Sequence, residues 1–208
     1  LKTKQERPTL RIVGRFDPVK GHREFFPLFK LILDRWTYDA PRPFLEIIGN
    51  PVNVTARMLS DSAEQAGLTL EEDLRIIPWR LKNLADVMSR THLGVVCSLG
   101  SEVICRVAQE FLLCGAPIAV SGAGALKEVL RSKSFGVHYG KLSLSDSADL
   151  IREQLYRGWQ ETEETRKKRA ELSREHFSFE RMGCDLDKVF SPMIRSESSE
   201  VLGGERTN

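Results

Sequence analysis

The sequence predicts an α/β protein in which a parallel sheet of about six strands is flanked by helices. Short apolar runs that end in Gly, Pro or Ser alternate along the chain with longer amphipathic segments. This alternation is typical of β-α units that build a parallel sheet. We expect the strands at Leu10–Phe16, Phe44–Ile48, Leu74–Ile77, Leu93–Cys97, Pro117–Val120 and Phe135–Tyr139.

Helices are expected between the strands, and two of them carry apolar residues at helical spacing. One apolar stripe follows the first strand and the other follows the last. We expect both stripes to be core that packs on the sheet. They consist of Phe25, Leu28, Phe29, Ile32 and Trp36, and of Leu144, Ala148, Ile151, Leu155 and Trp159.

The C-terminal quarter of the chain is more polar. From Glu161 to Glu175 it is densely charged, with Glu163 four residues before Lys167, which indicates a solvated helix face. Ser178 is expected to cap a last helix over residues 178–190. We expect the folded domain to span residues 1–195 and the polar residues 196–208 to form a disordered tail.

The charge balance and the lack of long apolar runs argue against several classes of function. The 208 residues carry 31 Lys and Arg against 29 Asp and Glu, so the net charge is +2. This balance gives no sign of binding to nucleic acid or to a membrane surface. No apolar run is long enough to cross a bilayer and the start has no signal peptide, so we expect a cytoplasmic protein. The first residue, Leu1, suggests a chain cut from a larger protein.

The cysteines and histidines predict no metal site and no disulfide framework. No Cys-x-x-Cys pair occurs, and the histidines fall in separate segments without metal-ligand spacing, so we interpret them as ordinary residues. We therefore expect no metal and no bound cofactor. The residues concerned are Cys97, Cys105, Cys114 and Cys184, and His22, His92, His138 and His176.

The first of three candidate ligand loops follows the first expected strand and reads Val-Gly-Arg-Phe-Asp-Pro-Val-Lys-Gly from Val13 to Gly21. Open α/β sheets bind ligands at the C-terminal ends of their strands. Arg15 and Lys20 could clamp a diphosphate there, because Arg offers a planar fork and Lys a movable point charge. On spacing alone, an ordinary turn beside a surface cation is an equal alternative.

The second loop leads from the fourth strand into an expected helix that begins at Ser101 or Glu102. The free N–H groups of such a helix start suit a phosphate. Glu102 and Glu110 are eight residues apart, so on one helix they would project from similar faces and could bind hydroxyls of one extended ligand. The alternative is an acidic residue that favours the helix dipole plus an unrelated surface glutamate.

The third loop, Ser121-Gly122-Ala123-Gly124, follows the fifth strand. Its two glycines indicate a tight turn with open backbone. It is not a complete dinucleotide fingerprint, because Lys127 stands where a third small residue is needed. By itself the loop does not predict a ligand.

Taken together, the three loops resemble the C-terminal domain of family 4, or group 1, retaining glycosyltransferases. Residues 13–21 are similar to that family's Gly-Arg-x-x-x-x-Lys-Gly motif, and Glu102 to Glu110 has the spacing of its Glu-x7-Glu motif. Cys-Gly-Ala-Pro and a Ser-x-x-Gly-x-x-x-Glu turn follow in the family's order. The resemblance covers about residues 10–190 and implies a Rossmann-like domain, one half of a GT-B enzyme.

The resemblance also implies roles for particular residues. Arg15 and Lys20 would bind the donor diphosphate, Glu102 would lie beside the transferred sugar, and Glu110 would bind the ribose hydroxyls. Val103 and Cys105 stand where the family usually has glycines, and Arg106 could supply a charge there or be an ordinary helix-surface residue. The implied catalytic residues are Glu102, Arg15 and Lys20, and the implied donor-binding residues are Gly14, Arg15, Lys20, Glu102, Val103, Ile104, Cys105 and Glu110.

For the whole enzyme, the resemblance implies transfer of a hexose-type sugar from UDP or GDP to a glycan or lipid-linked acceptor, as in cell-envelope polysaccharide synthesis. The partner would be an N-terminal acceptor-binding domain, absent here, through which the protein could associate with the inner face of the membrane. Without it, the fragment should be inactive. A non-catalytic nucleotide-binding scaffold of the same fold is the alternative, and an epimerase would need catalytic His and acid positions that we do not find.

Overall fold

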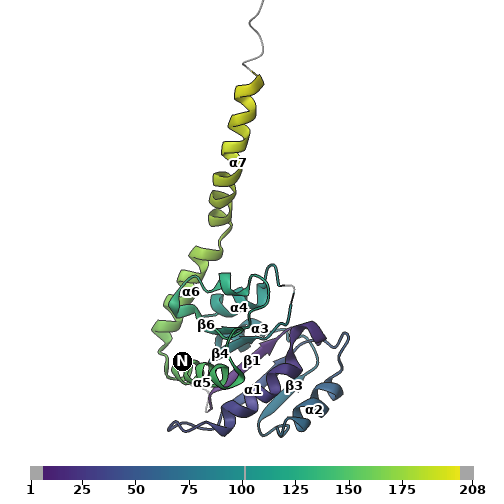
Figure 1. Ribbon diagram of the computed structural model, residues 1–208. Helices are drawn as coiled ribbons and strands as arrows, with labels where there is room; N and C mark the ends of the chain where they lie inside the picture. The colour runs from purple at the N-terminus through teal and green to yellow at the C-terminus, as the bar shows by residue number, and fades with distance from the viewer. Residues whose placement is uncertain (1–6, 101, 202–208) are drawn as a thin grey trace, which may run out of the picture.

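A computed structural model describes residues 7–100 and 102–201, and it shows the predicted sheet (Figure 1). All neighbouring strands are parallel, in the order β3-β2-β1-β4-β5-β6. Each expected strand is present, with ends that differ by at most three residues. The strands are β1 (Thr9–Val13), β2 (Phe44–Ile48), β3 (Leu74–Ile77), β4 (Leu93–Val96), β5 (Ile118–Val120) and β6 (Gly136–His138).

Helices cover both faces of the sheet, and each face has its own apolar core. One core joins α1, α2 and α5 to alternate strand residues such as Leu10 and Ile12. The other joins α3 and α4 to residues such as Val96 and Ile118. The helices are α1 (His22–Asp34), α2 (Ala56–Gln65), α3 (Leu84–Ser89), α4 (Arg106–Leu113), α5 (Leu144–Gln160), α6 (Glu163–Phe177) and α7 (Phe179–Val201).

The two apolar stripes lie on α1 and α5, which pack against each other, except that Trp36 lies two residues past the end of α1. Most of their members are buried as expected, including Phe29 and Ile32 on α1 and Ile151 and Leu155 on α5. Trp36 and Trp159 are half-buried, and Leu144, the first residue of α5, is 53% exposed, so the prediction fails at Leu144.

Helix α6 is solvated on most of its surface, but one of its charged side chains is buried. Arg169 is only 3% exposed. It forms two hydrogen bonds with the carboxylate of Glu161 and donates further bonds to the backbone oxygens of Gly115 and Ser134. The interpretation of this segment as a solvated face is therefore wrong at Arg169, which anchors the helix to the loops beneath it.

Helix α7 extends away from the domain as a single long helix (Figure 1). Ser178 caps it, since its hydroxyl accepts a hydrogen bond from the N–H of Arg181 at 3.1 Å. The helix continues to Val201, past the expected end at residue 190 and into the range where we expected a tail, while residues 202–208 lie outside the described residues.

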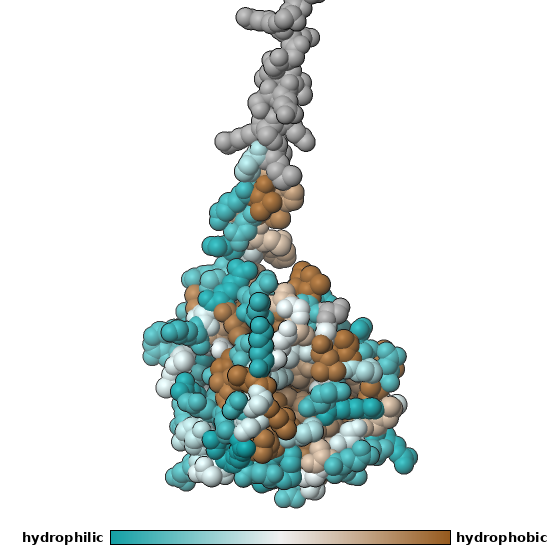
Figure 2. All heavy atoms as spheres, viewed as in Figure 1, coloured by the Kyte–Doolittle hydropathy of each residue, from teal (hydrophilic) through white to brown (hydrophobic). Residues whose placement is uncertain are grey.

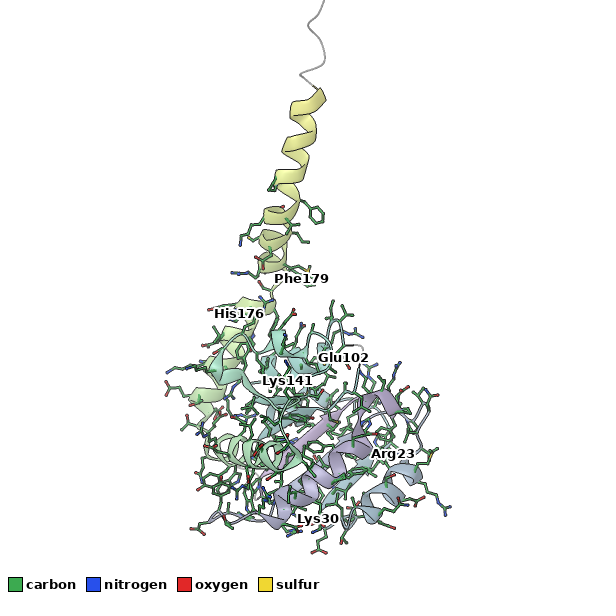
Figure 3. The ribbon with its side chains drawn as sticks, in the orientation of Figure 1. Arg23, Lys30, Glu102, Lys141, His176 and Phe179 are labelled. Carbon is green, nitrogen blue, oxygen red and sulfur yellow. The ribbon has the colours of Figure 1, made fainter. Side chains whose placement is uncertain are left out.

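One side of α7 is apolar and uncovered, as Figure 2 shows for the part whose side chains are described. This apolar stripe begins at Phe179, labelled in Figure 3 and 84% exposed. It consists of Phe179, Met182, Leu186, Val189 and Phe190. Among the described residues, no helix is both long and apolar enough to cross a membrane.

Candidate functional site

The first two candidate loops meet in a cavity of about 220 Å³ at the C-terminal ends of β1 and β4. These two strands are neighbours, yet β1 continues in the chain to β2 on its other side, so the strand order reverses between them. Ligands of open α/β sheets bind at such a switch point. Five residues of the expected donor-binding set line the cavity, namely Gly14, Lys20, Glu102, Ile104 and Cys105.

The first loop is held tightly against the end of β4. Asp17 caps the turn by accepting from the N–H of Val19, and Gly21 adopts a left-handed conformation with φ of 68°. A Cβ on Gly21 would lie 2.0 Å from the backbone oxygen of Cys97, so only glycine allows this approach. The turn thereby fixes Lys20 at the cavity.

Lys20 and Glu102 form an ion pair within the cavity. Glu102, labelled in Figure 3 in the loop between β4 and α4, is only 8% exposed. Ser98 donates a hydrogen bond to the same carboxylate oxygen at 2.6 Å, and Ser121 donates to the backbone oxygen of Ser98 at 2.5 Å. In the free protein the two groups expected to bind the donor therefore neutralise each other.

The third loop supports the backbone of Glu102. The N–H of Ala125 donates to the carbonyl oxygen of Glu102 at 2.8 Å. Gly124 has a φ of 53°, and a Cβ there would lie 2.2 Å from the same oxygen. The two-glycine turn thus holds the cavity wall, and the three loops converge around Glu102.

The expected helix start at Ser101 or Glu102 is wrong. Ser101 lies outside the described residues, Glu102 is not helical, and α4 begins at Arg106. In a helix that starts there, the carbonyl oxygen of Glu102 would accept a hydrogen bond from an N–H within the helix. It accepts instead from the N–H of Ala125, which follows the third loop. The idea that Glu102 and Glu110 project from similar faces of one helix therefore fails.

Three residues of the expected donor-binding set do not line the cavity. Glu110 is exposed on α4, and Val103 is 82% exposed in the loop before it. The Arg15 side chain is 58% exposed, with its guanidinium 3.7 Å from Asp17. All three lie next to cavity elements without reaching into the cavity itself.

His22 is a cavity residue that sequence reasoning missed. It is only 2% exposed, the first residue of α1, and its ring packs edge-on against Phe16 with centroids 5.6 Å apart. Burial, reinforced by the charge of Lys20, lowers the pKa of His22 to about 4. Its place directly after the Lys20-Gly21 turn is the signal that could have found it.

The free energy of unfolding of the domain should decrease as the pH is lowered, because of His22. Its pKa is lower in the folded than in the unfolded chain, so its contribution is complete above pH 6.5 and lost as the pH falls towards 4. We expect the free energy of unfolding to drop by about 2 kcal/mol from pH 7 to pH 5 through this group. Chemical denaturation of the wild type and His22→Phe should show this drop in the wild type only. An equal drop in both would assign it to other groups.

A second, larger cavity of about 460 Å³ lies on the opposite edge of the sheet. His92, which precedes β4, and Arg166 and Lys167 of α6 are among its lining residues. None of the three candidate loops reaches it. Since ligand sites of open sheets lie at the C-terminal ends of the strands, we place the functional site in the smaller cavity. No group of three or more potential metal ligands occurs among the described residues.

The structure is similar to solved sugar-transferring enzymes. Sucrose-phosphate synthase from Thermosynechococcus elongatus has a TM-score of 0.68 at 20% identity, with 92% of this chain covered and 46% of that one. Anabaena HepE in complex with UDP and glucose has a TM-score of 0.67 at 17% identity, with 90% and 49% covered. An E. coli trehalose-6-phosphate structure bound with UDP-2-fluoro glucose has a TM-score of 0.62 at 15% identity, with 88% and 44% covered.

These likenesses confirm the Rossmann-like half of a GT-B fold, and this chain spans less than half the length of each of these structures. Among curated proteins, none matches the sequence. The model of the family described as glycosyl transferases group 1 matches residues 1–175, which is most of the chain. The protein therefore belongs to the group 1 glycosyltransferases.

Proposed function

We propose that this chain is the donor-binding domain of a retaining glycosyltransferase that transfers a hexose-type sugar from a nucleoside diphosphate. One observation carries the proposal: Lys20 and Glu102 face each other in a cavity at the switch point of the sheet. A cation next to a carboxylate is suited to a sugar diphosphate, because its phosphates are anionic and its sugar hydroxyls are hydrogen-bond donors. Lys20 can bind the phosphates and Glu102 can accept from sugar hydroxyls.

In this proposal the chemistry is electrostatic. When the bond between the sugar carbon and the donor phosphate breaks, negative charge develops on the leaving diphosphate. Lys20 stabilises that charge, together with Arg15 once its exposed side chain turns inward. Glu102 orients the sugar and is not a covalent nucleophile. The backbone of Val103, Ile104 and Cys105 would lie along the sugar phosphate.

UDP is the nucleotide that we propose. HepE was solved with UDP and glucose and with UDP-glucose, and the E. coli trehalose-6-phosphate structure holds UDP-2-fluoro glucose. At identities of 15–18% these structures share the fold with this chain. Because they hold UDP or a UDP-sugar, UDP is the first nucleotide to test. No metal is needed in this scheme, since Lys20 and the backbone N–H groups at the start of α4 can bind the diphosphate.

A second domain is proposed to complete the enzyme. The apolar stripe on α7 is uncovered here, and each solved neighbour has about twice the length of this chain. An N-terminal acceptor-binding domain that covers the stripe would close the cleft over Glu102. The acceptor would be a glycan or a lipid-linked sugar in the cytoplasm, as in cell-envelope polysaccharide synthesis. Because both substrates must be oriented together, residues 1–208 alone should bind the donor and transfer nothing.

Glu110 is proposed to bind the ribose, which Glu110→Ala tests in a calorimetric titration with UDP, GDP and ADP. We expect UDP to bind most tightly and the variant to lose about tenfold in affinity, because a charged hydrogen bond contributes roughly 1.5–3 kcal/mol. Glu175→Ala is the matched control, since Glu175 is an exposed helical glutamate on α6.

Each outcome of this titration is decisive. An unchanged UDP affinity in a folded Glu110→Ala protein would remove the ribose role. Failure of all three nucleotides to bind would overturn the proposed function. If UDP binds and neither Glu110→Ala nor, in a further titration, the cavity substitution Lys20→Met weakens it, the chain is a nucleotide-binding scaffold whose site lies elsewhere.

A further inference from the structure

The net charge of the cavity depends on Arg106, which lies outside the donor-binding set that the family resemblance implies. Three charged side chains line the cavity, namely Lys20, Glu102 and Arg106. Lys20 and Glu102 neutralise each other in their ion pair. Burial raises the pKa of Cys97 to about 12, so this lining thiol is neutral. The remaining positive charge is that of Arg106.

Arg106 lines the cavity and is exposed to solvent. It is the first residue of α4, which runs from Arg106 to Leu113, and Cys105 before it makes no side-chain cap bond. Among the residues whose side chains the structure describes, 7–100 and 102–192, Arg106 makes no hydrogen bond and no ion pair. Its guanidinium is therefore available to an anion at the N-terminal end of α4, where the helix dipole is positive.

Arg15, the arginine that the family motif points to, is placed differently. Both arginines are exposed, but Arg15 does not line the cavity and Asp17 lies 3.7 Å from its guanidinium. The two arginines therefore differ in both position and pairing. They form a natural pair for comparison, because each lies beside the cavity and neither is buried.

A separate observation indicates that this wall of the cavity receives a ligand. His22 lines the same cavity and is 98% buried, yet its Nε2 atom has no hydrogen-bond partner within the described structure. Buried polar atoms are nearly always paired, so an unpaired one beside a cavity is explained by a group that binds there. Lys20, His22 and Arg106 would surround that group.

We propose that Arg106 binds the diphosphate of the sugar donor, next to Lys20 and at the start of α4. This inference rests on the proposed function and adds a binding residue to it. A guanidinium can form two parallel hydrogen bonds with phosphate oxygens. Arg106 therefore adds a positive charge and side-chain donors next to Val103 and Cys105, which stand where the family usually has glycines.

The test is a calorimetric titration of Arg106→Gln, Arg106→Lys and Arg15→Gln with UDP, uridine and inorganic pyrophosphate. We expect Arg106→Gln to weaken UDP and pyrophosphate by about tenfold to a hundredfold, the range of a charged hydrogen bond, and to leave uridine unchanged. Arg106→Lys should recover part of the loss, because it keeps the charge but not the fork. Arg15→Gln should cost less than Arg106→Gln.

Two results would overturn the proposal. In the first, Arg106→Gln binds UDP and pyrophosphate as the wild type does. In the second, it weakens uridine as much as UDP, which is the mark of a structural effect. The proposed function fails separately, when no nucleotide binds the wild type, and pyrophosphate then still tests Arg106. Circular dichroism and the melting temperature show that each variant is folded.

Discussion

Lys20→Met is expected to abolish measurable UDP binding and to lower the free energy of unfolding by about 2–3 kcal/mol. The stability loss arises because the variant leaves the carboxylate of Glu102 buried without its cation. Breaking a fully buried pair costs about 3–5 kcal/mol, and the Lys20 side chain is 28% exposed, so we expect less. Chemical denaturation and calorimetry measure the two effects.

A second substitution separates structure from binding. In Lys20→Met with Glu102→Gln the buried charge is gone, and Ser98 can still donate to the amide oxygen. Stability should therefore return to within about 1 kcal/mol of the wild type, because replacing both members of a buried pair is often neutral. UDP binding should stay lost. A Lys20→Met protein that keeps its affinity for UDP would contradict the diphosphate role of Lys20.

The sheet could be predicted from the sequence because its signals are local. Each strand is a short apolar run that ends in a turn residue, so its position can be read without the rest of the fold. Phe44–Ile48 and Leu74–Ile77 agree with the structure at both ends. Arg15, Lys20, Glu102 and Glu110 came from motif spacing, and the structure brings Lys20 and Glu102 together.

The parts that could not be predicted depend on contacts between distant segments. Helix α4 starts late because Ala125, 23 residues further along the chain, bonds to the carbonyl of Glu102. His22 looked ordinary because it follows Gly21, whose close fit against Cys97 just after β4 cannot be read from the local sequence. Arg169 looked solvated because its partners at Gly115 and Ser134 come from loops outside its helix.

Arg169→Met is expected to have the largest effect on stability of all the substitutions considered, a loss of about 3–5 kcal/mol in the free energy of unfolding. The side chains of Arg169 and Glu161 are 2% and 14% exposed, so the variant leaves the carboxylate of Glu161 largely buried without its cation. It also removes the donor that satisfies the backbone oxygens of Gly115 and Ser134. Arg174→Met, on the exposed side of the same helix, should change stability by less than about 0.5 kcal/mol.

Arg169→Met should lower the stability of the fold without changing donor binding, because Arg169 does not line the donor cavity. Under conditions where Arg169→Met remains folded, its UDP affinity should equal that of the wild type. Helix α6 leads directly into α7, so the Arg169 anchor also fixes where the apolar stripe of α7 begins. Adding Glu161→Gln removes the stranded charge and should recover part of the loss, while the two backbone oxygens stay unpaired. Full recovery in the double variant would mean that the carboxylate alone needs Arg169, and a loss below about 1 kcal/mol in the single variant would mean that Arg169 does not anchor the helix.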